Sequence, residues 1–453
     1  KVTIVGAGLG GLTAAIACRH GGFDVTILER APKIGNVGAG IQIPPNSAQT
    51  LGRLGVLPQI EKVSTIVESF DMRRYADGSL LASKPYGQAS VGLYGGHWRV
   101  IHCEDYHTIL LDEALRLGAT LQRDAHVENI NVEGTEIAMM DGSTMQADVV
   151  IGADGADPIK FVKAFVSRPS FPTETGDLAY RATFSRSQLE VLNNPRVDEL
   201  CAKKAVTVWF GPDKHCVFYP IRAGSEFNLV LLRPDNLPHG TRSSEGDISE
   251  MRATFDGWDP ILTALISCIS SVLKWKLMHH EELETWVQGN AALLGDACHP
   301  TLPYQAQGAA MAVEDGAVLG NLLSEYKKDL ESPDTKLRHC LEPTILHLYE
   351  EMRKQRTTLN VAGAEQNRIF YHLNDGPKQQ ERDAEMANFD FATGRSSYTW
   401  LDSEYNKDLL SYDATADARE VYRRRYEDQI SQDRQTTIRG DGSMASKPAS
   451  GHL

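Results

Sequence analysis

The 453-residue chain lacks long apolar runs, and it lacks any excess of positive charge. No segment approaches the roughly 18 consecutive apolar residues that a membrane-spanning helix needs, so we expect no membrane span. Lysine and arginine number 46 against 60 aspartate and glutamate residues, which gives a formal net charge of −14. Because nucleic acids and anionic membranes bind basic surfaces, this balance argues against either as a partner.

Cysteine is also scarce, and its placement argues against a disulfide framework. The seven cysteines are scattered, odd in number and without a CxxC pair. This pattern is typical of reduced intracellular thiols and offers no zinc-ligand spacing. The first residues form a strand-like segment without the charged and apolar regions of a secretory leader. We therefore expect an intracellular, cytoplasmic protein without a metal centre, and the sequence leaves its oligomeric state open.

The opening stretch, "KVTIVGAGLGGLTAAIACRHGGFDVTILERA", carries the clearest pattern in the chain. An apolar strand leads into a GxGxxG turn, a helical segment over 12–20 and a second strand over 25–28 that ends at Glu29. This βαβ order, with an acid after the second strand, is the fingerprint of dinucleotide binding. A structural glycine-rich turn is the competing interpretation, but both strands and the acid stand in register.

Each glycine of the turn has a physical task in such a site. Gly6 permits the tight turn, Gly8 lets a pyrophosphate approach the backbone, and Gly11 lets helix and strand pack closely. The helix N-terminus offers free N–H groups and a positive dipole end to the phosphates. Glu29 is placed to accept hydrogen bonds from ribose hydroxyls.

Two later segments return to this α/β character. The first, "ADVVIGADGADP" (147–158), is a buried strand that ends at Asp154-Gly155. The second, "AALLGDACHPTLPYQAQGAAMAVEDG" (291–316), reads as a buried strand, a loop with two prolines and a helix. Between them, short alternating stretches such as "LAYRATF" and "HCVFYPI" predict an antiparallel sheet over 176–288. The remainder is helical and charged, and it ends in a polar tail.

Three elements together resemble the class A flavin-dependent aromatic monooxygenases: GAGLGG with Glu29, Asp154-Gly155, and Gly295-Asp296 with its Pro/Gly loop. Within that family the chain is similar to the salicylate-hydroxylase-like branch, which includes fungal secondary-metabolism members. The resemblance covers roughly residues 1–425, and "GDACHPTLPYQAQGAAMAVEDGAVL" matches the family's GD motif nearly throughout. The segments "GAGIQIPPN", "AYRATF" and "HLNDGPKQQERD" also look like family segments. The first lies in "VGAGIQIPPNSAQTLGRLGV" (37–56), which reads as a glycine-proline loop entering an amphipathic helix. An ordinary strand-loop-helix crossover is the competing interpretation of 291–320.

The resemblance implies an α/β fold with a Rossmann-like GxGxxG FAD-binding domain, an inserted antiparallel β-sheet substrate domain and a helical C-terminal region. The expected domain boundaries are 1–70, 97–175 and 289–340 for the FAD-binding parts, 71–96 for substrate-domain strands, 176–288 for the substrate sheet, 341–430 for the helical region and 431–453 for a disordered tail.

The resemblance also implies FAD and NAD(P)H as cofactors. Asp296 would reach the ribityl or pyrophosphate part of FAD, and Pro303 would wall the flavin ring. The Gly308-Ala309 amides would face the N1–C2=O edge, where a helix N-terminus stabilises the reduced, anionic flavin. The FAD-binding residues implied in this way are Gly6, Gly8, Gly11, Glu29, Arg30, Gly40, Ile41, Arg99, Asp154, Asp296, Pro303, Gly308 and Ala309.

Two departures from the family pattern stand out. The family usually has an arginine that touches FAD where Cys103 stands, and Arg99, four residues earlier on the same strand-like segment, is expected to take part of that duty. After Asp154-Gly155 the family usually has a serine and an arginine, whereas this chain has Ala156-Asp157-Pro158 and then Lys160. This difference leaves the NAD(P)H contact open.

The activity that the resemblance implies is insertion of one oxygen atom of O₂, through a flavin C4a-hydroperoxide, into an electron-rich aromatic secondary metabolite. Two reactions stay open: hydroxylation of a phenol or aromatic acid, and 2,3-epoxidation of an indole alkaloid. A FAD- or NAD-dependent dehydrogenase without oxygen insertion is the alternative function.

Three residues of the predicted sheet are catalytic candidates. Arg181 stands mid-strand in an apolar run, where a cation is costly unless it faces a cavity or a partner. It could position the substrate or the peroxide, and a salt-bridged sheet arginine is the competing interpretation. Tyr219 would line the substrate pocket or pack in the core, and His215 could assist a phenolic proton.

Overall fold

The computed structural model describes the whole chain except residues 34–38, 132–134, 156–172, 280–281, 332–343 and 426–453. The polar tail expected from 431 and the departures at 156–160 therefore lie outside the described residues. Among the described residues, no helix combines the length and apolar character that crossing a membrane requires.

A six-stranded sheet forms one layer of the molecule, in the order β19-β20-β12-β1-β2-β8. All its neighbouring pairs are parallel except β19–β20. The opening βαβ unit predicted from the glycine turn lies at its centre, which confirms the Rossmann-like assignment. The strands are β1 (Val2–Val5), β2 (Val25–Leu28), β8 (Thr120–Gln122), β12 (Val149–Gly152), β19 (Val287–Gln288) and β20 (Ala291–Leu293).

Helices α1 (Leu9–His20) and α11 (Gly308–Glu331) pack against each other in the same direction. Their close approach depends on small residues, since a Cβ at Gly316 would lie 2.6 Å from the Ala14 nitrogen and one at Gly320 would lie 2.3 Å from Ala17 Cβ. Glycines at these positions let the two backbones come together. The parallel alignment brings both N-termini to one place.

An eight-stranded sheet forms the second layer, in the order β17-β18-β13-β16-β15-β14-β5-β6. It contains the stretches predicted as an antiparallel sheet, and its one parallel pair is β14–β5. The strands are β5 (Ser69–Arg74), β6 (Leu80–Pro85), β13 (Thr173–Ser185), β14 (Ala205–Gly211), β15 (Lys214–Ile221), β16 (Glu226–Pro234), β17 (Ser243–Glu245) and β18 (Leu273–His279).

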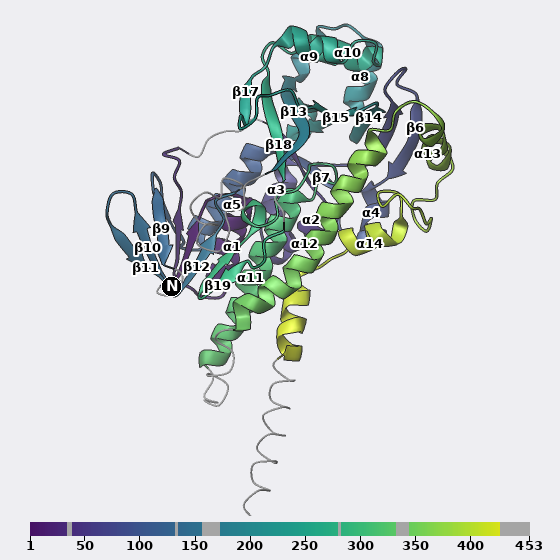
Figure 1. Cartoon of the computed structure of the whole chain (residues 1–453). Coiled ribbons are helices and arrows are strands. Elements are labelled where there is room, and N and C mark those ends of the chain that lie inside the picture. Colours follow the sequence, from purple (N-terminus) through teal and green to yellow (C-terminus); the bar gives the residue numbers. More distant parts are fainter. Residues whose placement is uncertain (34–38, 132–134, 156–172, 280–281, 332–343, 426–453) are drawn as a thin grey trace, which may run out of the picture.

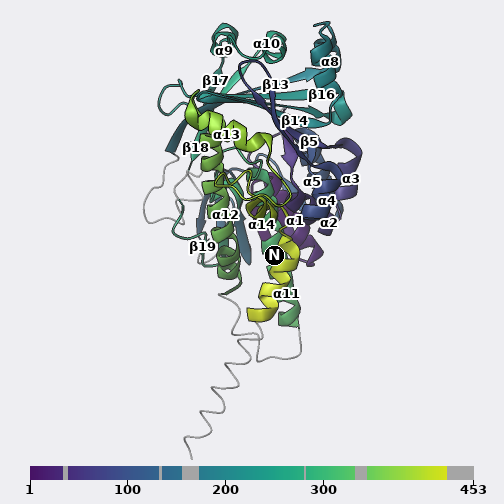
Figure 2. The same ribbon diagram turned by 90° about the vertical axis from the view of Figure 1, so that its right-hand side faces the viewer.

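Short helices close the outer face of this sheet, at the top of Figures 1 and 2. Side chains of α9 and α10, among them Met251 and Leu262, pack with Tyr180 and Trp209 of the sheet in one apolar cluster. These helices are α7 (Arg186–Glu190), α8 (Pro195–Ala202), α9 (Ile248–Thr254) and α10 (Pro260–Ser267). The 3₁₀ turn η1 (Arg222–Gly224) lies elsewhere, beside β4, β15 and β16.

Two three-stranded sheets complete the β structure. One has the order β3-β7-β4 and includes Gly40–Ile43, a strand in a stretch that the sequence predicted as a glycine-proline loop. The next helix begins at Pro45, a position that suits proline because its missing N–H needs no partner there. These sheets consist of β3 (Gly40–Ile43), β4 (Thr65–Ile66) and β7 (Arg99–His102), and of β9 (Val127–Asn131), β10 (Glu136–Met139) and β11 (Thr144–Gln146).

The long helix α12 (Thr344–Tyr371) runs from the parallel sheet to the eight-stranded sheet, as both views show. At its far end Tyr371 stacks on Phe210 of β14 with ring centroids 4.6 Å apart. The domain boundaries given above remain a prediction. The other helices are α2 (Pro45–Arg53), α3 (Leu57–Val63), α4 (Gly87–Tyr94), α5 (Cys103–Arg116), η2 (Gly295–Ala297), α13 (Pro377–Ala387) and α14 (Ser403–Leu410).

Candidate active site

Two cavities adjoin at the glycine-rich turn. The first, of about 430 Å³, lies between the N-termini of α1 and α11 and the inner face of the eight-stranded sheet. The second, of about 520 Å³, lies at the ends of β1 and β2 beside β9. Gly8, Ala153 and Gly155 line both. The arrangement therefore suits one elongated ligand that passes the start of α1.

The glycine turn packs tightly on one side and stays open on the other. Gly6 has φ +109°, and a Cβ there would lie 2.3 Å from the Ala153 carbonyl oxygen. A Cβ at Gly11 would lie 2.2 Å from the Gly6 oxygen, whereas one at Gly8 would meet only the Ala153 oxygen, at 3.9 Å. Gly8 is also the N-cap of α1 and supplies no side-chain cap. A ligand can therefore approach the first N–H groups of α1 at Gly8.

Glu29 at the end of β2 is held by the backbone. Its carboxylate accepts hydrogen bonds from the N–H groups of Ala7 and Ala31, each at 2.9 Å. The side chain lines the second cavity together with Arg30 and Asp154. Glu29, Arg30 and Asp154, which the sequence predicts as FAD-binding residues, therefore lie together at this cavity.

Asp296, Pro303, Gly308 and Ala309 line the first cavity, at the end opposite to Glu29. Asp296 lies below the protein surface, among many protein atoms. This burial raises the pKa of its carboxyl, an effect that Asp315 reinforces and His299 opposes. Its side chain is nevertheless exposed, because the surface that it presents forms part of the cavity wall. The Thr301 hydroxyl, also in this wall, has no hydrogen-bond partner among the described residues.

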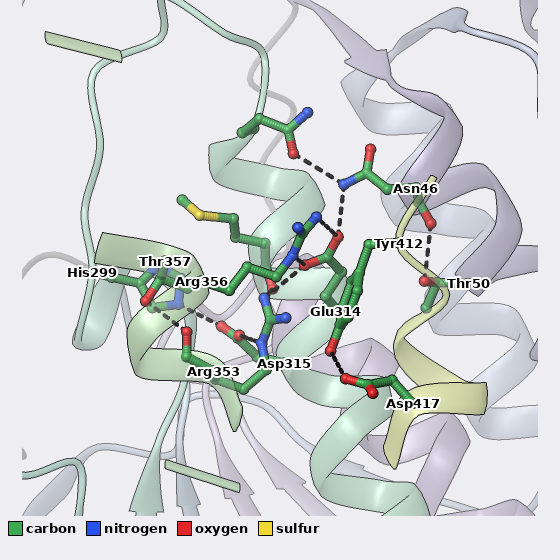
Figure 3. Close-up of polar contacts among 12 residues, drawn as sticks. Asn46, Thr50, His299, Glu314, Asp315, Arg353, Arg356, Thr357, Tyr412 and Asp417 are labelled. Carbon is green, nitrogen blue, oxygen red and sulfur yellow. Dashed lines mark hydrogen bonds and ion pairs between the residues drawn. The ribbon is translucent and has the colours of Figure 1, made fainter. Parts of the chain in front are cut away.

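A buried ionic cluster, shown in Figure 3, lies behind this loop. Asp315 of α11 accepts hydrogen bonds from the Gly295 N–H (3.0 Å), His299 Nε2 (2.5 Å) and Arg353 Nε (2.7 Å). Although burial opposes ionisation, His299 and Arg353 hold the pKa of Asp315 at about 2. One carboxylate thus fixes the loop that carries Asp296 to both α11 and α12.

The neighbouring Glu314 extends the same cluster. Its carboxylate binds Arg353 at 2.8 Å and Arg356 at 2.9 Å, and it accepts a hydrogen bond from Asn46 Nδ2 at 2.7 Å. Asn46 also donates to Gln307 Oε1 at 3.0 Å, just before α11 begins. Each buried charge is therefore paired, and the start of α11 is tied to α2.

On the sheet side, Arg181 of β13 and Tyr219 and His215 of β15 line the first cavity. The backbone of Arg181 pairs with both neighbouring strands, but its exposed guanidinium makes no hydrogen bond or ion pair with any described residue, unlike that of a salt-bridged sheet arginine. Burial raises the pKa of the Tyr219 hydroxyl, and the charge of Arg181 opposes that shift. A Cβ at Gly40 would lie 2.6 Å from the Tyr219 ring, so Gly40 gives the tyrosine its room. Ile41 lines the same wall.

Arg99 is not brought to either cavity. Its guanidinium donates to Glu61 at 2.6 Å and lines a separate cavity of about 390 Å³. The strand β7 ends at His102 and α5 begins at Cys103, so the alternation that would place Arg99 and Cys103 on one face is interrupted between them. The predicted FAD contact of Arg99 therefore lacks support. Cys103 itself lines the first cavity, and burial raises the pKa of its thiol.

Sequence reasoning missed the residues that support the site from behind. Asp315 could have been noticed as an acid placed about two turns into a helix of small residues. Arg353 gave no signal in the sequence. His372, which contacts His215 behind the cavity wall, begins the family-like segment "HLNDGPKQQERD", but nothing in that segment points to His215 as its partner.

Comparisons with known proteins agree with this geometry. The sequence model of a family described as "FAD binding domain" matches residues 1–335. The FAD-dependent monooxygenase OpS4 of Beauveria bassiana (strain ARSEF 2860) is 37% identical over 420 residues, covering 92% of this chain and 95% of that protein. The 6-hydroxynicotinate 3-monooxygenase of Pseudomonas fluorescens is 33% identical over 331 residues, covering 72% and 83%. A solved salicylate hydroxylase substrate complex has a similar fold, with a TM-score of 0.74, 24% identity and coverage of 93% and 97%.

Proposed function

This chain belongs to the FAD binding domain family and is an FAD-dependent monooxygenase, and we propose that it hydroxylates a phenolic aromatic acid or a related phenolic metabolite. One observation carries the proposal: a single cavity joins the N-termini of two parallel helices to an arginine and a histidine of the opposite sheet. The relatives named for hydroxylating 6-hydroxynicotinate and 3-hydroxybenzoate, the latter 32% identical to this chain, support an aromatic substrate.

The residues of the two cavities fit FAD. Gly8 leaves room for a diphosphate where a side chain would fill it, and the uncapped start of α1 offers N–H groups to an anion. Glu29 would hold the ribose, Asp296 the ribityl chain, and the unpartnered Thr301 hydroxyl offers one more polar contact. Bound FAD would supply electron transfer from NAD(P)H to O₂ and the activation of that oxygen.

The protein itself contributes placement, charge and proton handling. Arg181, as an unpaired cation in a largely apolar cavity, would orient a carboxylate or phenolate of the substrate. His215 is buried in the same wall, and burial together with His372 lowers its pKa well below the usual value. A neutral imidazole there can accept the proton of a phenolic hydroxyl.

A phenolic substrate suits this wall better than an indole. An indole ring is electron-rich without losing a proton, so its epoxidation needs no proton acceptor at the position of His215. A phenol gains reactivity on ionisation, and Arg181 would stabilise the phenolate that results. The dehydrogenase alternative finds no support among the relatives named above.

The test begins with the purified protein, which we expect to be yellow, with flavin bands near roughly 370 and 450 nm. NAD(P)H oxidation should then be screened with salicylate, 3-hydroxybenzoate and 6-hydroxynicotinate, against indole and benzoate. We expect stimulation by a phenolic acid and a product that has gained one oxygen atom by mass spectrometry. A colourless protein that takes up no FAD, or NAD(P)H oxidation without oxygen in the product, contradicts the proposal.

A further inference from the structure

Two histidines that are 157 residues apart in sequence meet at the edge of the first cavity. His215 Nδ1 and His372 Nε2 lie 2.8 Å apart. His215 lines the cavity and is fully buried, whereas His372 follows the last residue of α12 and is partly exposed. The pair therefore extends from the cavity wall toward the protein surface.

The surroundings keep both imidazoles neutral. Burial lowers the pKa of His372 to about 4, with Asp177 opposing and Arg368 reinforcing the shift. Asp177 gives little compensation because its carboxylate already binds Arg368, at 2.5 and 2.9 Å, and the Tyr304 hydroxyl, at 2.6 Å. The rings of Tyr304 and Tyr371 each lie 5.0 Å from the His215 ring.

A 2.8 Å contact between two neutral imidazoles requires one N–H donor and one bare nitrogen. Because His215 uses Nδ1 for this contact, its Nε2 is the nitrogen left for a group in the cavity. No described residue gives a hydrogen bond to that Nε2 or to His372 Nδ1. Each end of the pair is thus available to an outside partner, the substrate on one side and water on the other.

We propose that His372 is the positioning and proton-accepting partner of His215, and that the pair conducts the phenolic proton of the substrate out of the cavity. This inference rests on the proposed function. The substrate O–H gives its proton to His215 Nε2, His215 Nδ1–H gives its proton to His372 Nε2, and His372 Nδ1–H gives its proton to water. One proton enters and one leaves. The reverse passage, when the product oxygen is reprotonated, restores both tautomers.

A purely structural role explains the contact less well. The segment is already anchored, because the Asp213 N–H donates to the His372 carbonyl oxygen at 3.2 Å and Tyr371 stacks on Phe210. Placing two ionisable rings in a buried contact is costly if packing alone is needed, since an apolar pair would fill the same space.

The experiment uses the FAD-loaded full chain and a phenolic acid that it turns over in the screen above. Stopped-flow absorbance follows the conversion of bound phenol to phenolate, and a pH indicator follows proton release. For His372→Asn we expect unchanged FAD content, substrate Kd and final phenolate fraction, but phenolate formation at least about tenfold slower. Added imidazole should restore part of the rate, since His372 reaches the surface. His347→Asn, an exposed histidine on α12, is the matched control and should behave as wild type.

Each outcome decides between the interpretations. An unchanged rate of phenolate formation in His372→Asn overturns the relay, while turnover of the phenolic acid keeps the proposed function. A rise in the substrate Kd together with a fall in FAD content and in rate, without rescue by imidazole, also overturns it and assigns His372 a structural role. If no phenolic acid is bound or turned over, the proposed function itself fails. Indicator measurements on the wild-type protein alone, showing no proton released when the phenol binds, would likewise rule out the relay.

Discussion

Asp315 accepts a hydrogen bond from the backbone N–H of Gly295, 3.0 Å away and twenty residues earlier in the chain. The contact ties the turn before Asp296 to the helix whose N-terminus faces the same cavity. Since Asp315 also binds His299 and Arg353, its charge stabilises three segments at once.

We expect Asp315→Asn to lower both stability and FAD affinity. Removing one partner of a buried ion pair typically costs about 3–5 kcal/mol, because the other charge is left uncompensated. The loss should appear in urea unfolding of the apoprotein, and a weaker Kd should appear in FAD titration. Glu325→Gln, on the same helix but in a more exposed ion pair with Lys328, should change stability by less than about 1 kcal/mol. Equal stability of both variants would contradict the role given to Asp315.

Stability should fall with acid in two separate ranges. Burial lowers the pKa of His372 from 6.5 to about 4, so the unfolded chain takes up that proton first and stability declines between about pH 6.5 and 4. The Asp315 carboxylate, with a pKa lowered from 3.8 to about 2, contributes stability above about pH 4 that is lost as the pH falls toward 2. Unfolding free energies measured across pH should show both ranges, and His372→Asn should remove part of the first. If His372→Asn leaves the pH dependence of the unfolding free energy unchanged, the lowered pKa of His372 does not contribute to it.

Two glycines of the opening turn should separate folding from cofactor binding. Gly11→Ala places a methyl group 2.2 Å from the Gly6 oxygen, so we expect a loss of about 1–3 kcal/mol in stability. Gly8→Ala meets nothing closer than 3.9 Å in the protein, but its methyl group stands where the two cavities join. It should fold normally and bind FAD at least about tenfold more weakly, a loss of about 1.4 kcal/mol. Thermal unfolding and FAD fluorescence titration check both, and tight FAD binding by Gly8→Ala would count against the assigned diphosphate position.

Arg181→Ala should leave FAD binding intact and reduce turnover of phenolic acids. A hydrogen bond to a charged group contributes about 1.5–3 kcal/mol, which corresponds to roughly a 10- to 150-fold fall in kcat/KM. Arg186→Ala is the control, because that arginine stands just beyond the end of the same strand and pairs with Glu190 outside the cavity. If Arg181→Ala retains full turnover, the residue does not act on the substrate.

The sequence predicted those parts of the candidate site that depend on local sequence patterns. The GxGxxG turn, Glu29 and the Gly308 helix start each depend on neighbours within a few residues, and all of them line the two cavities. The expectation that Arg99 reaches the FAD site used a spacing of four across the point where a strand becomes a helix, and the structure places Arg99 at a separate cavity. Local periodicity cannot locate that boundary to within one residue.

The supporting contacts could not be predicted for a different reason. His372 meets His215, and Arg353 meets Asp315, only because α12 packs against both layers of the molecule. Neither segment carries a motif for its partner, so the contacts depend on tertiary packing alone. The strand Gly40–Ile43 was missed since its flanking glycines and prolines are also typical of loops.

The helix α12 connects the pair Arg353–Asp315 to the pair His372–His215. Arg353 lies within it and His372 follows its last residue, and nineteen residues of helix correspond to about 28 Å. Because the helix is continuous between the two residues, a change in its tilt at one end also moves the other end. The contact of Arg353 with Asp315 and the contact of His372 with His215 therefore both depend on α12, and a substitution that bends the helix between Arg353 and His372 should disturb both contacts.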